Sequence, residues 1–247
     1  MKRIFLMIFI SFAALSASGD LFAQDNDDDG KLSLTVDAAS GFVWRGLSNN
    51  STPVIQPAIT FTQGKFSIGT WASTPFVPGD YQEIDIFASY QITPALSIAI
   101  SDYYDCGWNW DNDRYFNYKK EETMHSFDLQ LIYNGDENFP LKATLSTIIG
   151  GSDLKTKDGK RKQNFSTYFE LGYASTTRSG LDWEIFAGAV PMESEFYDID
   201  GAAVVNIGLG VSKNFEITPT YSLPLSLKFS VNPAHRAAFL VASIALF

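Results

Sequence analysis

The feature that most constrains this chain is a repeated alternation of apolar and polar residues in segments of about ten residues. In Leu223 to Asn232, for example, Leu225, Leu227 and Phe229 alternate with serine and lysine side chains. A period of two is typical of β-strands with different surroundings on their two faces. After the N-terminal segment, no stretch holds 18 consecutive apolar residues, which excludes a helical membrane protein.

These segments predict an all-β fold, an antiparallel transmembrane β-barrel of about 12 strands in an up-and-down meander. A β-sandwich would alternate too, but its strands usually have about five or six residues, and these segments are longer. The strands are expected at Lys31 to Val43, Val54 to Thr62, Lys65 to Ser73, Glu83 to Gln91, Leu96 to Tyr104, Ser126 to Tyr133, Leu141 to Ile149, Phe165 to Tyr173, Leu181 to Ala189, Ala203 to Ser212, Leu223 to Asn232 and Ala237 to Phe247.

The N-terminal segment is typical of an exported protein. Lys2 and Arg3 precede the apolar run from Ile4 to Leu15, and small residues follow. We therefore expect a signal peptide over residues 1–23, cleaved near Ala23, then an acidic leader over 24–30 and a barrel over 31–247. Export together with a membrane barrel predicts the outer membrane of a Gram-negative bacterium.

The chain ends in an apolar strand whose last residue is Phe247. An aromatic residue there fits the interfacial girdle of a barrel and is expected to act as a membrane-insertion signal. The expected partners are outer-membrane lipid, the barrel assembly machinery acting on this strand, and small solutes or ions. Both faces of the last strand are apolar, and we expect Leu240, Ala242, Ile244 and Leu246 to face the lumen.

Composition narrows the possible functions. The formal net charge of -10 makes the chain a poor candidate for binding nucleic acid, and the single Cys106 cannot form an intramolecular disulfide. No cofactor motif is present and no metal site is predicted. The segment from Asp105 to Glu122 is rich in acids and aromatics, but its spacing matches no EF-hand loop, so metal or glycan binding there stays open.

The connections alternate in length, as in barrels with short periplasmic turns and longer outer loops. With the N-terminus in the periplasm, the short turns would be Gln63-Gly64, 93–95, 135–140, 176–180 and, less short, Asn214 to Ser222. The outer loops would be 44–53, 74–81, 105–122, 151–163, 191–201 and 233–236.

The first strands also carry a family resemblance. The stretch Ser40-Gly-Phe-Val-Trp-Arg-Gly-Leu-Ser48, the later Pro53 and Gln56-Pro57, the strand Gly69-Thr-Trp-Ala-Ser73 and Glu83-Ile-Asp85 resemble the TorF-type porins. Members of that family often have Cys where this chain has Thr70. The resemblance implies an outer-membrane channel, and it transfers no functional residue.

The polar faces of the strands are expected to line a narrow, weakly cation-favouring lumen. The expected pore-lining and constriction residues are Arg45, Ser67, Trp71, Glu83, Asp85, Asp128, Lys142, Glu170, Asp182, Glu184 and Lys228. One hypothesis places Arg45 opposite Glu83 and Asp85 as a transverse field, with Trp71 as a stacking surface. The alternative is a structural ion pair inside a plugged barrel.

Two other classes of protein compete with a channel. An outer-membrane barrel hydrolase needs Ser, His and an orienting acid together, but only His125 and His235 exist, and the adjacent Ser126 should point to the opposite face. We therefore expect no enzyme. A secreted β-sandwich that binds carbohydrate is the third class, and it would lack a closed sheet.

Overall fold

The computed structural model describes residues 30–107, 115–136, 139–218 and 221–246. The predicted signal peptide, the leader up to residue 29 and Phe247 lie outside these ranges, as do residues 108–114 of the acidic loop. The described part of the chain contains no helix long and apolar enough to cross a bilayer.

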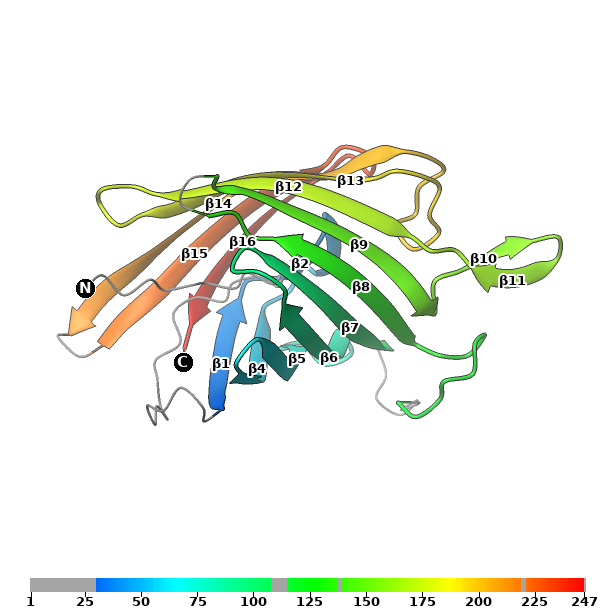
Figure 1. Cartoon of the computed structure of the whole chain (residues 1–247), viewed down its shortest axis with the longest axis horizontal. Coiled ribbons are helices and arrows are strands. Elements are labelled where there is room, and N and C mark those ends of the chain that lie inside the picture. The colour runs from blue at the N-terminus through cyan, green and yellow to red at the C-terminus, as the bar shows by residue number, and fades with distance from the viewer. Residues whose placement is uncertain (1–29, 108–114, 137–138, 219–220, 247) are drawn as a thin grey trace.

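Twelve antiparallel strands form one closed barrel in up-and-down order, as predicted (Figure 1). Because the sheet closes on itself, a β-sandwich is excluded. The barrel strands are β1 (Lys31–Ala39), β4 (Val54–Gln63), β5 (Phe66–Pro75), β6 (Gln82–Gln91), β7 (Leu96–Gly107), β8 (His125–Tyr133), β9 (Leu141–Gly151), β12 (Thr167–Thr176), β13 (Asp182–Val190), β14 (Ala203–Thr218), β15 (Tyr221–Asn232) and β16 (Ala237–Ala245).

Two small hairpins stand outside the barrel sheet. One is formed by β2 (Phe42–Trp44) and β3 (Leu47–Asn50), and the other by β10 (Leu154–Lys157) and β11 (Lys160–Gln163). The first lies in the connection between β1 and β4, and the second in the connection between β9 and β12. Both connections are at the same end of the barrel.

The two ends of the barrel differ in the length of their connections. At one end, called the turn end, the strands are joined by residues 64–65, 92–95, 134–140, 177–181 and 219–220. At the other, called the loop end, the connections are 40–53, 76–81, 108–124, 152–166, 191–202 and 233–236. The predicted turn from Asn214 to Ser222 is wrong, because β14 continues to Thr218 and pairs there with Tyr221 of β15.

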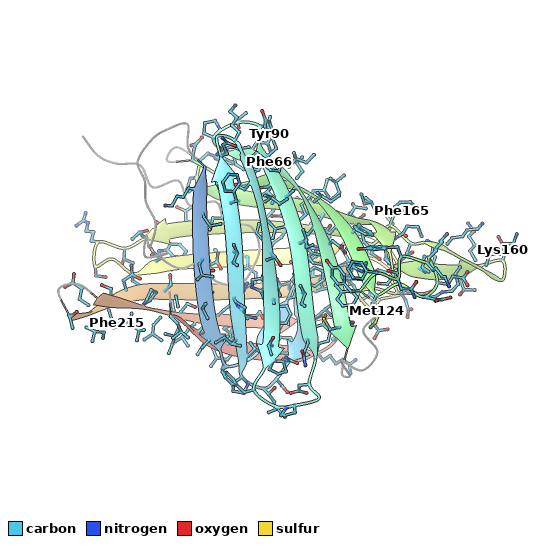
Figure 2. The ribbon with its side chains drawn as sticks, turned by 90° about the horizontal axis from the view of Figure 1, so that it is seen from below. Phe66, Tyr90, Met124, Lys160, Phe165 and Phe215 are labelled. Atoms are coloured by element: carbon cyan, nitrogen blue, oxygen red, sulfur yellow. The ribbon has the colours of Figure 1, made fainter. Side chains whose placement is uncertain are left out.

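The outer surface of the barrel is apolar and its interior is polar. Leu34, Ile59, Ile68, Ile100 and Leu129 are among the outward residues, each at least 39% exposed. Figure 2 shows side chains along the outer side of the strands. The residues between them along the strands point inward and include Thr35, Gln56, Ser67, Ser101 and Gln130, all buried. Soluble monomers rarely expose so continuous an apolar surface, whereas transmembrane barrels show this arrangement.

The faces of the last strand are the reverse of the prediction. Leu240 is 67% exposed and lies on the outer surface, while Val241 and Ser243 pair with the inward residues Lys228 and Ser226. The hydroxyls of Ser226 and Ser243 are 2.5 Å apart. A shift of one residue moves every side chain of a strand to the other face, and when both faces are apolar the sequence does not distinguish between them.

We predict that Leu129→Arg, at the middle of β8 on the outer surface, lowers the free energy of unfolding in lipid vesicles by about 2–4 kcal/mol, because the charge would enter the hydrocarbon. Urea titrations followed by Trp fluorescence measure the effect. Thr156→Arg, in the exposed β10–β11 hairpin, is the control and should be nearly neutral. An equally small effect of Leu129→Arg would mean that lipid does not contact this face.

Candidate functional site

The connection between β1 and β4 folds back into the lumen instead of lying outside as a loop. The expected first strand, Lys31 to Val43, is too long: β1 ends at Ala39, and residues 42–50 form the β2–β3 hairpin. Its tip is a two-residue turn at Arg45 and Gly46, both with positive φ, 47° and 79°. Two positive φ angles in a row are the geometry of the tight type I′ turn.

Gly46 lies directly against the barrel wall. A Cβ at this position would come within 1.9 Å of the carbonyl oxygen of Val205 in β14. From β15, the Asn232 amide donates a hydrogen bond of 3.0 Å to the Gly46 carbonyl. Only glycine combines this φ with this close approach, so the hairpin tip fits the wall at one place.

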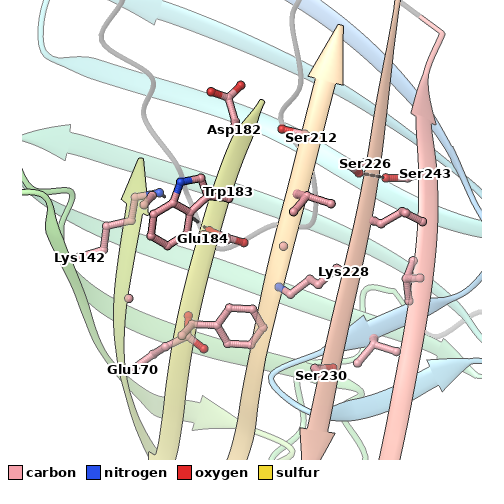
Figure 3. A pocket seen from close by; sticks show the side chains of 18 of the residues that line it. Lys142, Glu170, Asp182, Trp183, Glu184, Ser212, Ser226, Lys228, Ser230 and Ser243 are labelled. Atoms are coloured by element: carbon pink, nitrogen blue, oxygen red, sulfur yellow. Dashed lines mark hydrogen bonds and ion pairs between the residues drawn. The ribbon is translucent and has the colours of Figure 1, made fainter. Parts of the chain in front are cut away.

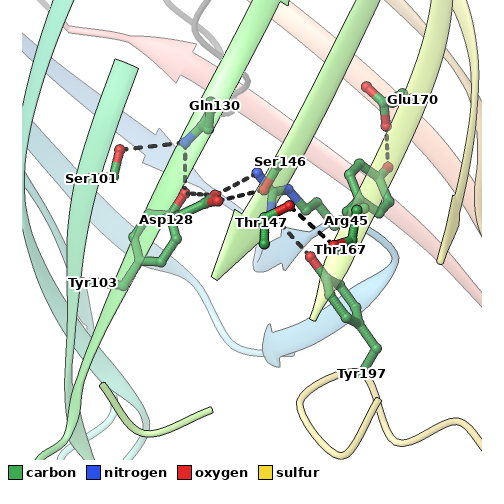
Figure 4. Close-up of polar contacts among 11 residues, drawn as sticks. Arg45, Ser101, Tyr103, Asp128, Gln130, Ser146, Thr147, Thr167, Glu170 and Tyr197 are labelled. Carbon is green, nitrogen blue, oxygen red and sulfur yellow. Dashed lines mark hydrogen bonds and ion pairs between the residues drawn. The ribbon is translucent and has the colours of Figure 1, made fainter. Parts of the chain in front are cut away.

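Arg45 joins the hairpin to the opposite wall. Its guanidinium donates to Oδ2 of Asp128 in β8 over 2.8 Å, and both side chains are almost fully buried (Figure 4). Asp128 also accepts hydrogen bonds from the Tyr103 hydroxyl at 2.9 Å and the Ser146 hydroxyl at 2.5 Å. A buried charge is tolerated when it is paired and hydrogen-bonded, as both oxygens of Asp128 are here; on the Arg45 side, the buried Nε has no hydrogen-bond partner among the described residues.

Aromatic rings cover the same guanidinium. Its central carbon lies 4.3 Å from the centre of the Trp44 ring and 4.9 Å from that of Tyr168. Tyr197, in the 191–202 connection, accepts a 3.0 Å hydrogen bond from Arg45 and stacks on Trp44 at 5.9 Å. Burial raises the pKa of the Tyr197 hydroxyl to about 12, so this hydroxyl is neutral at physiological pH. The hairpin and this connection thus pack against each other and occupy the lumen at the loop end.

The predicted transverse field is wrong, because Arg45 pairs with Asp128 and not with Glu83 or Asp85. Glu83 instead accepts hydrogen bonds from the Tyr81 hydroxyl at 2.6 Å and the Asn49 amide at 3.4 Å. The sequence does not reveal this pairing, because it does not predict the inward β2–β3 hairpin that brings Arg45 to Asp128.

Trp71 is not an accessible stacking surface either. It is 5% exposed and packs on Phe42 of the hairpin, with ring centres 5.2 Å apart. Ser67, Glu83 and Asp85 are buried on the same side of the lumen. The β4–β6 side of the interior is therefore filled by side chains and by the hairpin.

The rest of the lumen holds a cavity of about 540 Å³, part of whose wall, with Lys142, Glu184 and Lys228, is seen in Figure 3. The hairpin residues Trp44 and Arg45 also line it. It reaches the turn end, because Thr176, the last residue of β12, and Asn134, directly after β8, also line it. Its volume is within the range of small-molecule sites. The predicted lumen residues that line it are Arg45, Lys142, Glu170, Asp182, Glu184 and Lys228.

The charges around this cavity are mostly balanced by neighbours. The Lys142 amine is 3.9 Å from Glu184, and the Lys228 amine lies 4.6 Å from the centre of the Phe186 ring. Glu170 accepts hydrogen bonds from the Tyr168 hydroxyl and, at 2.9 Å, from the Asn206 amide. With Asp182 at the turn end, the wall carries three acids and two lysines besides Arg45.

Several residues that matter here have no sequence signal of their own. Tyr103, Ser146, Tyr197 and Asn206 complete the polar network, and nothing in their local sequence predicts it. One signal is present: Gly46, flanked by Phe42, Val43, Trp44 and Leu47, is typical of a tight hairpin turn between short strands.

His125 does not form a catalytic arrangement with a serine among the described residues. Its Nδ1 is 2.8 Å from Asp102, and its Nε2 is 2.6 Å from the carbonyl oxygen of Tyr115. The neighbouring Ser126 hydroxyl pairs with Ser152 at 2.8 Å. Within the described ranges, no group of three or more His, Cys, Asp or Glu is placed to hold a metal ion.

Comparisons with known proteins give little. No family model matches the chain, and a search of curated proteins finds no significant match. One similar solved structure is that of Wzi, an outer membrane protein involved in group 1 capsule assembly in Escherichia coli and a carbohydrate-binding β-barrel. The TM-score is 0.35 and the identity 11%, over 87% of this chain and 56% of Wzi. The chain thus spans little more than half of Wzi, and so low a score supports no assignment.

We predict that Asp128→Asn destabilises the barrel by about 3–5 kcal/mol, because Arg45 would keep its charge in a buried site without an anionic partner. Urea unfolding in detergent micelles measures the change. Asp182→Asn is the matched control, since Asp182 is exposed and accepts a 2.6 Å hydrogen bond from the equally exposed Thr176 hydroxyl; it should cost less than about 1 kcal/mol. Equal effects of the two variants would contradict a structural role for the pair.

Proposed function

We propose that this protein is an outer-membrane channel for small solutes or ions, closed at the loop end by the β2–β3 hairpin. The apolar outer surface and polar interior support a membrane location. The short connections favour a turn end in the periplasm and a loop end outside the cell. The resemblance of residues 40–85 to the TorF-type porins points to the same class.

The observation that carries the proposal is the hairpin itself, anchored by Arg45 above a cavity that reaches the turn end. In this state a solute can enter from the periplasmic side but meets Trp44 and Arg45. Passage requires the hairpin to move toward the loop end. A barrel of about 12 strands is wide enough for a narrow passage once that space is cleared.

The ion pair between Arg45 and Asp128 favours a hairpin that can move as a gate over one that fills the lumen permanently. A buried ion pair stabilises little relative to apolar packing, because both charges lose their hydration. Its best-attested use is to specify one arrangement among several, as a switch does. Because β2 and β3 are not part of the barrel sheet, breaking the contact between Arg45 and Asp128 loosens the hairpin without disturbing the strand pairing of the wall. The hydrogen bond from Asn232 to Gly46 must then break as well before the tip can move.

We predict that Gly46→Ala opens the channel, because the added Cβ would overlap the Val205 carbonyl and push the hairpin from the wall. Planar-bilayer recordings should show low conductance for the wild type and a clear increase for the variant. Gly64→Ala is the matched control: Gly64 also has a positive φ, of 57°, but nothing lies within 4 Å of the place that a Cβ would occupy there.

Variants of the hairpin that remain non-conducting would contradict the channel. If Gly46→Ala and a chain lacking residues 42–50 both stay non-conducting while still folding into membranes, the barrel is a plugged structural barrel. A conductance that rises equally in Gly64→Ala would mean that loss of stability, and not the hairpin, is responsible.

The charges of the cavity predict the selectivity of the open state. Glu170, Asp182 and Glu184 exceed Lys142 and Lys228 along its wall, so cations should be favoured weakly. In the Gly46→Ala background, Asp182→Asn with Glu184→Gln should lower the ratio of cation to anion permeability. The reversal potential in a KCl gradient measures it. Glu121→Gln with Glu122→Gln, on the exposed 108–124 connection, is the control and should leave the ratio unchanged.

A further inference from the structure

The β10–β11 hairpin concentrates positive charge at the loop end of an otherwise acidic chain. It extends beyond the rim of the barrel, with Lys160 near its tip (Figures 1 and 2). Its basic residues, in a chain of formal net charge -10, are Lys155, Lys157, Lys160, Arg161 and Lys162. All are exposed except the half-buried Lys155.

The strand register gathers four of these lysines on one face. Lys155 pairs with Lys162, and Lys157 with Lys160, directly across the hairpin. Since side chains alternate between faces, all four lie together, while Thr156 and Arg161 lie on the other face. Like charges directly opposite each other destabilise a strand pair, so the arrangement is unfavourable without an anion.

Against its five basic residues the hairpin has one acid, Asp158 in its turn, and Asp158 forms no ion pair with them. No described carboxylate lies within 4 Å of these basic groups, the described ion pairs being those of Arg45, Lys119, His125 and Lys142. Leu154, 3% exposed, is on the face opposite the lysines, which therefore point away from the body of the barrel. The lysine face is free to meet an external anion.

The position of the hairpin favours an anion of the membrane over a soluble one. Phe165, 52% exposed, lies at its base, between the barrel and Lys160 in Figure 2. Exposed aromatic side chains at the rim of a barrel sit at the membrane interface. Lys162 is three residues from Phe165, so it stays within about 11 Å of that level even if the chain is fully extended.

We propose that Lys155, Lys157, Lys160 and Lys162 bind the phosphate groups of an anionic glycolipid in the outer leaflet of the outer membrane. Ammonium groups near an anionic lipid surface each contribute about 1 kcal/mol. This interaction rests on the outer-membrane location and orientation proposed above, and it is independent of any passage through the lumen.

The test is binding of fluorescently labelled lipopolysaccharide, carrying phosphorylated lipid A, to the full chain in non-ionic detergent. The variant Lys155→Gln with Lys162→Gln should bind about thirtyfold more weakly than the wild type, since two ammonium groups are lost at about 1 kcal/mol each and 1.4 kcal/mol is a factor of ten. The variant Lys157→Gln with Lys160→Gln should behave in the same way. Lys119→Gln with Lys120→Gln, on the neighbouring exposed connection, removes the same charge and should bind as the wild type does.

Each further outcome decides the proposal. Weaker binding of dephosphorylated lipid A would support phosphate recognition, and equal binding would overturn it. Equal losses in the hairpin and control variants would reduce the effect to net charge and overturn a specific site. Tighter binding of heparin than of lipopolysaccharide would assign the face to a soluble polyanion and overturn the lipid. The lysine substitutions should leave the conductance of the Gly46→Ala variant unchanged, which would support a lysine site that acts independently of the lumen. A changed conductance would contradict that independence.

Discussion

Closure of the sheet between its first and last strands is the constraint on which the rest of the molecule depends. In lipid, each backbone N–H and C=O needs a partner within the protein, which an open sheet edge does not supply. Here β1 and β16 pair over only Asp37 to Ala39, with flanking hydrogen bonds at Ser40 and Leu246. Since β1 ends at Ala39 while the loop-end half of β16 continues beside β15, the chain leaves the wall at this seam and enters the lumen.

The β2–β3 hairpin follows from that exit, and it brings a charge into the barrel. Arg45 reaches Asp128 across the lumen because the turn at Arg45 and Gly46 aims the guanidinium away from the wall that Gly46 contacts. Further hydrogen bonds surround the pair at this level: the Tyr103 and Ser146 hydroxyls donate to Asp128, and Tyr197 accepts from Arg45, while the buried Nε of Arg45 has no partner in the described part of the chain. The closed sheet and the hairpin inside the lumen therefore both depend on where β1 ends.

The wall of the barrel is far more predictable from the sequence than its interior. Alternation locates the twelve strands to within a few residues at most ends, because lipid and water impose opposite requirements on neighbouring side chains. It fails where those requirements do not differ: both faces of β16 are apolar, so the prediction places Leu240 on the wrong side. It also extends the first strand to Val43, because Phe42 and Trp44 are as apolar inside the plug as they would be in the wall.

Side-chain contacts across the lumen cannot be predicted from the sequence for a further reason. The partner of Arg45 is 83 residues away in the sequence, and the choice between Asp128 and Glu83 depends on which way the hairpin folds. The Arg-Gly pair signals a turn, but a turn outside the barrel and a turn inside it have the same local sequence. Direction is decided by the fit of Gly46 to Val205, which only the assembled wall provides.

The size of the cavity depends on glycine residues that lie next to the large aromatic side chains of the lumen. Tyr168 and Phe186 would be expected to narrow the lumen, but each ring lies over a glycine of a neighbouring strand. A Cβ at Gly188 would come within 2.0 Å of the Tyr168 hydroxyl, and one at Gly208 within 2.4 Å of the Phe186 ring. Because these two positions are glycines, the neighbouring strands leave room for the rings, and bulky inward residues coexist with the cavity that residues of β8 to β16 line. The width of such a lumen thus depends on what stands beside each aromatic residue on the next strand, and a count of inward aromatic residues does not predict it.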